Sequence, residues 1–137
     1  MNIHWLERHL GETLVATGVV HLLYSARVNQ SVRAAIWRDG LVNTVPDQGE
    51  RNEALWFTTG GGLMIGAGLL ARSHIRRTGT LPPAFGAALL ATALANGILQ
   101  PLSGIWVVAA EGVLALRIAT TRPIRAASPR AAARAAA

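Results

Sequence analysis

The stretch ALWFTTGGGLMIGAGLLA, residues 54–71, decides the fold class of this chain. It contains no Asp, Glu, Lys or Arg, so a helix formed by it has no charged face. A helix on the surface of a soluble bundle has one apolar stripe and one polar face. An apolar stretch of about 17 residues or more is instead typical of a membrane span. We therefore interpret residues 54–71 as crossing a bilayer.

Other apolar blocks on either side of this stretch predict three more spans. Of the 137 residues, 51% are hydrophobic, and residues 13–26 and 78–110 also lack the four charged residue types. The second of these blocks is long enough to cross a bilayer twice around Pro101. The predicted spans are residues 10–26, 54–71, 82–100 and 103–118. They give an all-α four-helix transmembrane bundle, in a membrane domain of residues 1–118.

The connection between the first two spans predicts a short amphipathic helix. In NQSVRAAIWRDG, residues 29–40, apolar side chains recur at helical spacing and the pattern stops at Gly40. Tryptophan is favoured at headgroup depth, so we expect Trp37 and Trp56 in the outer membrane interface. With Arg38 and Asp39, they would form a lid over the outer end of the bundle. The tail, residues 119–137, is composed mainly of Ala, Arg and Pro and is expected to be a mobile basic extension.

The positive charge predicts the orientation in the membrane. The formal net charge is +6, and every basic residue apart from histidine is arginine. With both termini cytoplasmic, nine arginines lie inside and four, at positions 27, 33, 38 and 51, lie outside, as the positive-inside rule requires. The expected location is a bacterial inner membrane, with multiple spans. Anionic lipid headgroups are the expected partners of the inner arginines, and nucleic acid is not an expected partner.

Polar residues inside the predicted spans form the candidate site. At about 1.5 Å per residue, His21 and Glu111 lie at nearly the same depth in the outer half of the bundle. An ionised carboxylate facing lipid costs about 2.5 kcal/mol or more, so Glu111 is expected to face inward. The function hypothesis is a ligand-binding or proton-linked layer; the alternative is a hydrogen bond that only fixes helix register. The candidate residues of the layer are His21, Glu111, Asn96, Thr92, Thr59 and Gln100.

Two functions follow from these patterns. One is binding or passage of a small, mostly apolar molecule through the polar layer. The other is a structural or accessory subunit of a homo-oligomer or larger membrane complex, which packs through small residues such as the GxxxG pair Gly62 and Gly66. Cysteine is absent, and no HExxH or similar metal-binding spacing occurs. We therefore expect no catalytic residue, metal or cofactor, and a protein that is not an enzyme.

Several motifs resemble those of an uncharacterised bacterial family of small four-span integral membrane proteins. They are GVVHLLY (18–24), WRDGLVN (37–43), ALWFTTGG (54–61), LPPAFGAALLATA (81–93) and PLSGIWVV (101–108). The resemblance extends over roughly residues 10–117 and leaves out the tail. It implies the fold and the membrane location, and it implies no reaction.

Overall fold

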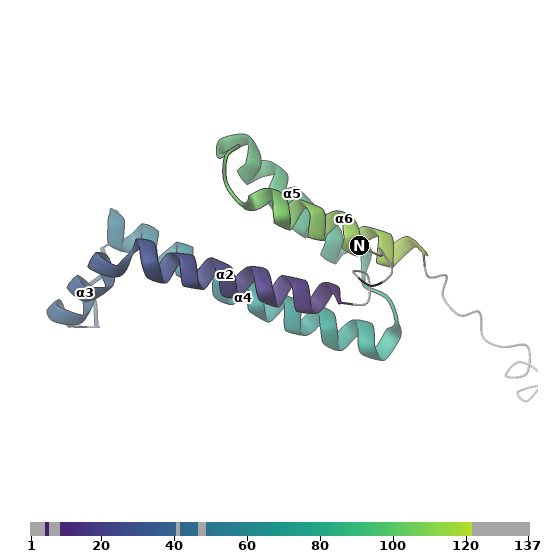
Figure 1. Ribbon diagram of the computed structural model, residues 1–137, viewed down its shortest axis with the longest axis horizontal. Helices are drawn as coiled ribbons and strands as arrows, with labels where there is room; N and C mark the ends of the chain where they lie inside the picture. Colours follow the sequence, from purple (N-terminus) through teal and green to yellow (C-terminus); the bar gives the residue numbers. More distant parts are fainter. Residues whose placement is uncertain (1–4, 6–8, 41, 47–48, 122–137) are drawn as a thin grey trace, which may run out of the picture. The chain divides into compact units, whose positions relative to one another are not determined.

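The computed structural model describes residues 5, 9–40, 42–46 and 49–121, and these residues form helices and connections without any strand. Among the described residues, five helices follow one another (Figure 1). They are α2 (Leu10–Val28), α3 (Gln30–Asp39), α4 (Glu50–Thr78), α5 (Pro83–Leu99) and α6 (Ile105–Thr121). The all-helical fold expected from the sequence is therefore confirmed.

The helices coincide with the predicted segments, but several of their ends differ. Helix α4 has 29 residues and extends beyond residues 54–71 in both directions. Its extra turns hold acidic residues at the start and arginines at the end, an arrangement that the helix dipole favours. Helix α6 continues to Thr121, into the start of the predicted tail; residues 122–137 lie outside the described residues. Helix α3 is the predicted amphipathic helix, and Gly40 follows it with φ of 92°.

The chain divides into two compact units. Residues 8–73 hold α2, α3 and most of α4, and residues 1–7 with 74–137 hold the end of α4, α5 and α6. Among the described helices, α4 is the one that is both long and apolar enough to cross a membrane. Helix α5 is also apolar but has 17 residues.

In the first unit, α2 and α4 pack as an antiparallel hairpin with very close backbones (Figure 1). A Cβ atom added to Gly68 would lie 2.7 Å from the Gly11 carbonyl oxygen, and one added to Gly18 would lie 2.9 Å from the Gly61 carbonyl oxygen. The small residues of this interface recur every seven positions in each helix. They are Gly11, Gly18 and Ser25 in α2, and Ala54, Gly61 and Gly68 in α4. This repeat keeps one face of each helix against its partner.

In the second unit, α5 and α6 form another antiparallel pair. A Cβ atom on Gly86 would lie 2.9 Å from the Gly112 carbonyl oxygen, so the two backbones touch there. At the other end of the pair, the ring of Trp106 covers Gly97, at 2.9 Å from an added Cβ atom. The Trp106 indole N–H donates to the Pro101 carbonyl at 2.9 Å. The PLSGIW turn is thus held by one aromatic side chain that packs on α5 and bonds to its own loop.

Candidate functional site

His21 lies in the α2–α4 hairpin and contacts Phe57 of α4 in two ways. Its Nε2 atom is 3.0 Å from the Phe57 carbonyl oxygen, and its ring stacks on the Phe57 ring with centroids 4.0 Å apart and planes 19° apart. A carbonyl oxygen only accepts, so Nε2 carries the proton of this hydrogen bond. The glycine at position 61 makes room for the imidazole, because an added Cβ atom there would lie 3.1 Å from His21 Cδ2.

One turn further along α2, a short polar chain joins the two helices. The hydroxyls of Ser25 and Thr58 are 2.8 Å apart, and Thr58 also donates to the Ala54 carbonyl at 2.8 Å. The Asn29 amide donates to the Ser25 hydroxyl at 3.3 Å. Ser25 is 2% exposed, so its hydroxyl needs this partner inside the protein. Thr58 is therefore the acceptor from Ser25, with its own proton directed to Ala54.

A cleft of about 390 Å³ lies directly beyond this polar chain, where α2 ends and α4 begins. Its walls come from the last turns of α2, the start of α3 and the first two turns of α4. Small-molecule sites have volumes of roughly 300–1,000 Å³ and are mainly apolar with a few polar groups. The lining residues are Tyr24, Val28, Asn29, Ser31, Val32, Glu50, Glu53, Ala54 and Phe57.

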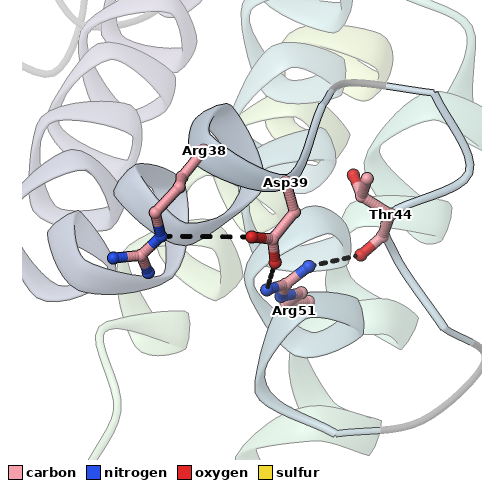
Figure 2. A network of polar contacts seen from close by, with 4 residues as sticks. All are labelled: Arg38, Asp39, Thr44 and Arg51. Atoms are coloured by element: carbon pink, nitrogen blue, oxygen red, sulfur yellow. Dashed lines mark hydrogen bonds and ion pairs between the residues drawn. The ribbon is translucent and has the colours of Figure 1, made fainter.

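The connection between α3 and α4 is closed by an arginine clasp (Figure 2). The Arg51 guanidinium donates to the Asp39 carboxylate at 2.5 Å and to the Thr44 carbonyl at 2.9 Å, and Arg38 approaches the same carboxylate at 4.0 Å. The hydrogen bond from Arg51 and the charges of both arginines hold the pKa of Asp39 below its ordinary value of 3.8. The clasp ties the end of α3 to the first turn of α4, beside the cleft.

Two side chains of the predicted polar layer, those of Thr59 and Asn96, bond within their own helices. Thr59 donates to the Leu55 carbonyl at 2.9 Å, and the Asn96 amide donates to the Thr92 carbonyl at 2.8 Å. Gln100 follows α5 as its C-cap residue, and its backbone N–H donates to the Asn96 carbonyl at 2.8 Å. Such bonds to the preceding turn satisfy polar side chains in a helix without any contact to another helix.

Glu111, the other central residue of the predicted layer, is buried in α6, with 6% of its surface exposed. It belongs to the second unit, whereas His21 belongs to the first. The pairing of Glu111 with His21 therefore stays a prediction.

The predicted lid residues lie on α3 and α4 but do not line the cleft. Trp37 is 70% exposed and Trp56 is 67% exposed. The part of α3 that borders the cleft is its first turn, with Ser31 and Val32, rather than its last turn. Arg38 and Asp39 take part in the clasp described above.

The predicted packing glycines make no close contact within the α2–α4 hairpin. A Cβ atom added to Gly62 or Gly66 would meet no atom of the hairpin's described residues within 4 Å. The close contacts of α4 with α2 are made by Gly61 and Gly68 instead. Gly62 and Gly66 therefore do not pack α4 against α2.

The sequence analysis did not identify the residues that line the cleft. A signal for them exists: Glu50, Glu53, Ala54 and Phe57 follow one another at i, i+3, i+4 and i+7 and so share one face of α4. Across the described residues, no three His, Cys, Asp or Glu side chains are grouped so that they could hold a metal ion.

Comparison with known proteins places the chain in one sequence family. The model of a family of unknown function, DUF6463, matches residues 6–122. No curated protein and no solved structure matches the chain. The match includes all five described helices.

Proposed function

Because the chain belongs to the DUF6463 family of unknown function, we propose its function from its own residues: a membrane protein that binds a small, mostly apolar molecule. The proposed site is the cleft at the end of the α2–α4 hairpin. Its activity is binding or passage of this molecule, without catalysis.

Exposed apolar side chains support the membrane part of the proposal. In α4, Leu63 is 70% exposed and Leu70 is 72% exposed, and in α5, Ile98 is 79% exposed. Burying apolar surface from water gains about 25 cal/mol per Å², so long helices with such faces are favourable in lipid and unfavourable in water. We propose that α2, α4, α5 and α6 all span the inner membrane of a bacterium, with both termini in the cytoplasm.

The cleft is the single observation that carries the binding function. In this orientation it opens on the outer side, because α2 ends and α4 begins there. Apolar and aromatic side chains form most of its walls, and Asn29, Ser31 and two glutamates supply the polar groups. His21 of the predicted polar layer stacks on Phe57, which lines the cleft. The site therefore lies at the membrane surface, where a partly apolar molecule concentrates.

A native mass measurement tests this function. The full-length protein is extracted in mild detergent, and its intact mass is recorded for the wild type, Ser31→Trp and Ala34→Trp. Ser31 is exposed and lines the cleft, so a tryptophan there fills it; Ala34 is exposed on the same helix and is not a lining residue. We expect a small extra mass on the wild type and on Ala34→Trp that is absent from Ser31→Trp. Absence of any extra mass, or its retention in Ser31→Trp, would contradict the proposal.

The open surface at Gly62 and Gly66 favours a second candidate function, that of an interaction subunit. A helix from a second copy or from another membrane protein could approach the α4 backbone closely there, because no atom of the hairpin occupies the space. This surface is separate from the glycine contacts that hold the hairpin together.

Cross-linking in membranes tests the second candidate. Gly62→Leu and Gly66→Leu should abolish a cross-linked oligomer while the hairpin stays folded, because the added side chains meet nothing in the hairpin. Leu63→Ala serves as the control, because Leu63 is 70% exposed and lies about 100° around the helix from Gly62. A protein that is monomeric in cross-linked membranes would rule this function out.

A further inference from the structure

We infer that the ligand of the cleft is a lipophilic organic cation, a substituted ammonium ion with apolar groups. This inference rests on the proposed binding function and adds the chemical class of the ligand. It follows from three features of the cleft: its charge, its aromatic surface and the absence of arginine among the described residues that line it.

The charge of the cleft comes from two glutamates on one wall. Glu50 and Glu53 lie in the first turn of α4 and contribute two formal negative charges. The N-terminal end of a helix carries about half a positive charge, so it offsets only part of them. Among the described residues, neither carboxylate takes part in an ion pair, because the nearby Arg51 is bound to Asp39 and Thr44. Both side chains are exposed, and a cationic ligand in the cleft would supply them with a counter-charge.

The aromatic surface comes from Tyr24 and Phe57. Their ring centroids are 6.1 Å apart and their planes are inclined by 52°, so the two rings form a corner. Both residues line the cleft. The face of an aromatic ring attracts a cation within about 6 Å of its centroid, most strongly when the cation is poorly hydrated. Stacking of His21 on Phe57 restricts the rotation of the Phe57 ring, so less conformational entropy is lost when a ligand binds.

The lining also decides against a phosphate-bearing ligand. Among the described residues, no arginine borders the cleft, and the charged residues that do are both acidic. The headgroup of a zwitterionic lipid would bring a phosphate next to the carboxylates of Glu50 and Glu53, and these negative charges would repel one another. The apolar groups of Val28, Val32 and Ala54 favour a cation that carries hydrocarbon substituents over a hydrated metal ion.

Equilibrium dialysis with two matched probes tests the inference. Benzyltrimethylammonium is the cation, and neopentylbenzene is its neutral equivalent, in which a carbon atom replaces the nitrogen. Both are measured on the full-length protein in a neutral sugar detergent, for the wild type, Glu50→Gln/Glu53→Gln, Tyr24→Leu and Glu12→Gln. Glu12 is a carboxylate in α2 that pairs with Arg72 outside the cleft, so its variant controls for the loss of a carboxylate elsewhere in the hairpin. Circular dichroism confirms that each variant stays helical.

We expect the wild type to bind the cation more tightly than its neutral equivalent. The double variant should lose about tenfold in affinity for the cation, equivalent to about 1.4 kcal/mol, with neopentylbenzene unchanged. Tyr24→Leu should lower the affinity for the cation by a smaller factor and leave the affinity for neopentylbenzene unchanged. Glu12→Gln should change neither affinity. Phosphocholine, which carries the same ammonium group beside a phosphate, should not displace benzyltrimethylammonium.

Three results would overturn the inference. Equal binding of the two probes would refute the cationic ligand and leave the binding function intact. If phosphocholine competes for the cleft as effectively as benzyltrimethylammonium itself, the ligand is a lipid headgroup instead. Binding of neither probe would remove the inference together with the proposed function.

Discussion

The close packing of the α2–α4 hairpin makes a quantitative prediction at two glycines of one helix, Gly68 and Gly66. A Cβ atom on Gly68 would lie 2.7 Å from Gly11 O and Val15 N, and these backbone atoms would have to move by about 0.7 Å to reach the 3.4 Å of ordinary contact. A Cβ atom on Gly66 meets nothing within 4 Å. Overpacking of this kind costs about 1–3 kcal/mol.

The change from glycine to alanine also favours the helix by about 1 kcal/mol, and this gain is common to both positions. We therefore expect Gly68→Ala to be about 1–3 kcal/mol less stable than Gly66→Ala, since the common gain cancels in the comparison. The free energy of unfolding is measured by SDS titration in mixed micelles, followed by far-ultraviolet circular dichroism. Equal stability of the two variants would refute the glycine interface between α2 and α4.

Three further predictions concern polar contacts. Ser25→Ala and Thr58→Ala should each lower the free energy of unfolding by about 1–3 kcal/mol, because each leaves the other hydroxyl poorly satisfied. In a double-mutant cycle, the double variant should lose less than the sum of the two single losses. Trp106→Phe keeps the ring over α5 and loses one hydrogen bond, so its unfolding free energy should fall by about 0.5–1.5 kcal/mol. The Asp39 carboxyl should titrate below 3.8 in carbon-13 NMR, and the Arg51→Gln variant should raise its pKa towards that value.

The lowered pKa of Asp39 also fixes the pH range over which the clasp stabilises the protein. A carboxyl group with a lowered pKa in the folded state contributes its full stability above its ordinary pKa, which is 3.8 for Asp39. This contribution is lost as the pH falls through the lowered folded pKa. The contribution of the clasp to the free energy of unfolding is therefore expected to be constant between pH 5 and 8. A decrease of this contribution within that range would contradict the lowered pKa of Asp39.

The sequence was sufficient to predict where the helices lie. The hydrophobic blocks predicted the four helices α2, α4, α5 and α6, and the helical spacing of apolar residues before Gly40 predicted α3. The ends of α4 were missed because hydropathy marks the apolar part of a helix, whereas hydrogen bonding continues through charged turns such as those at Glu50 and Arg76.

The packing contacts were harder to predict than the helices. The GxxxG pair Gly62 and Gly66 was predicted as a packing surface for an oligomer or larger complex and stays a prediction, whereas α2 and α4 meet at small residues spaced by seven, such as Gly61 and Gly68. Both patterns are present in the same glycine-rich stretch, and sequence spacing alone does not decide which face of a helix meets a neighbour. The seven-residue repeat becomes informative only when the same spacing in α2 is compared with it.

The candidate site was predicted in part. His21 was singled out as an intramembrane histidine, and the structure places its ring against Phe57. Thr59 was assigned to the predicted layer, and its hydroxyl donates to the Leu55 carbonyl of its own helix. Glu50 and Glu53 were treated as residues of the connection, because their place beside Tyr24 depends on how α2 and α4 are aligned.

Labelling of a single cysteine at position 31 tests the central claim that an outward-facing cleft binds a small molecule. The natural chain has no cysteine, so Ser31→Cys is the only site for a membrane-impermeant maleimide, and Arg76→Cys is the control for the cytoplasmic side. We predict that intact spheroplasts label Ser31→Cys but not Arg76→Cys, and that saturating benzyltrimethylammonium slows the labelling. Failure of Ser31→Cys to react before the membrane is permeabilised, or a rate unchanged by the cation, would contradict the account.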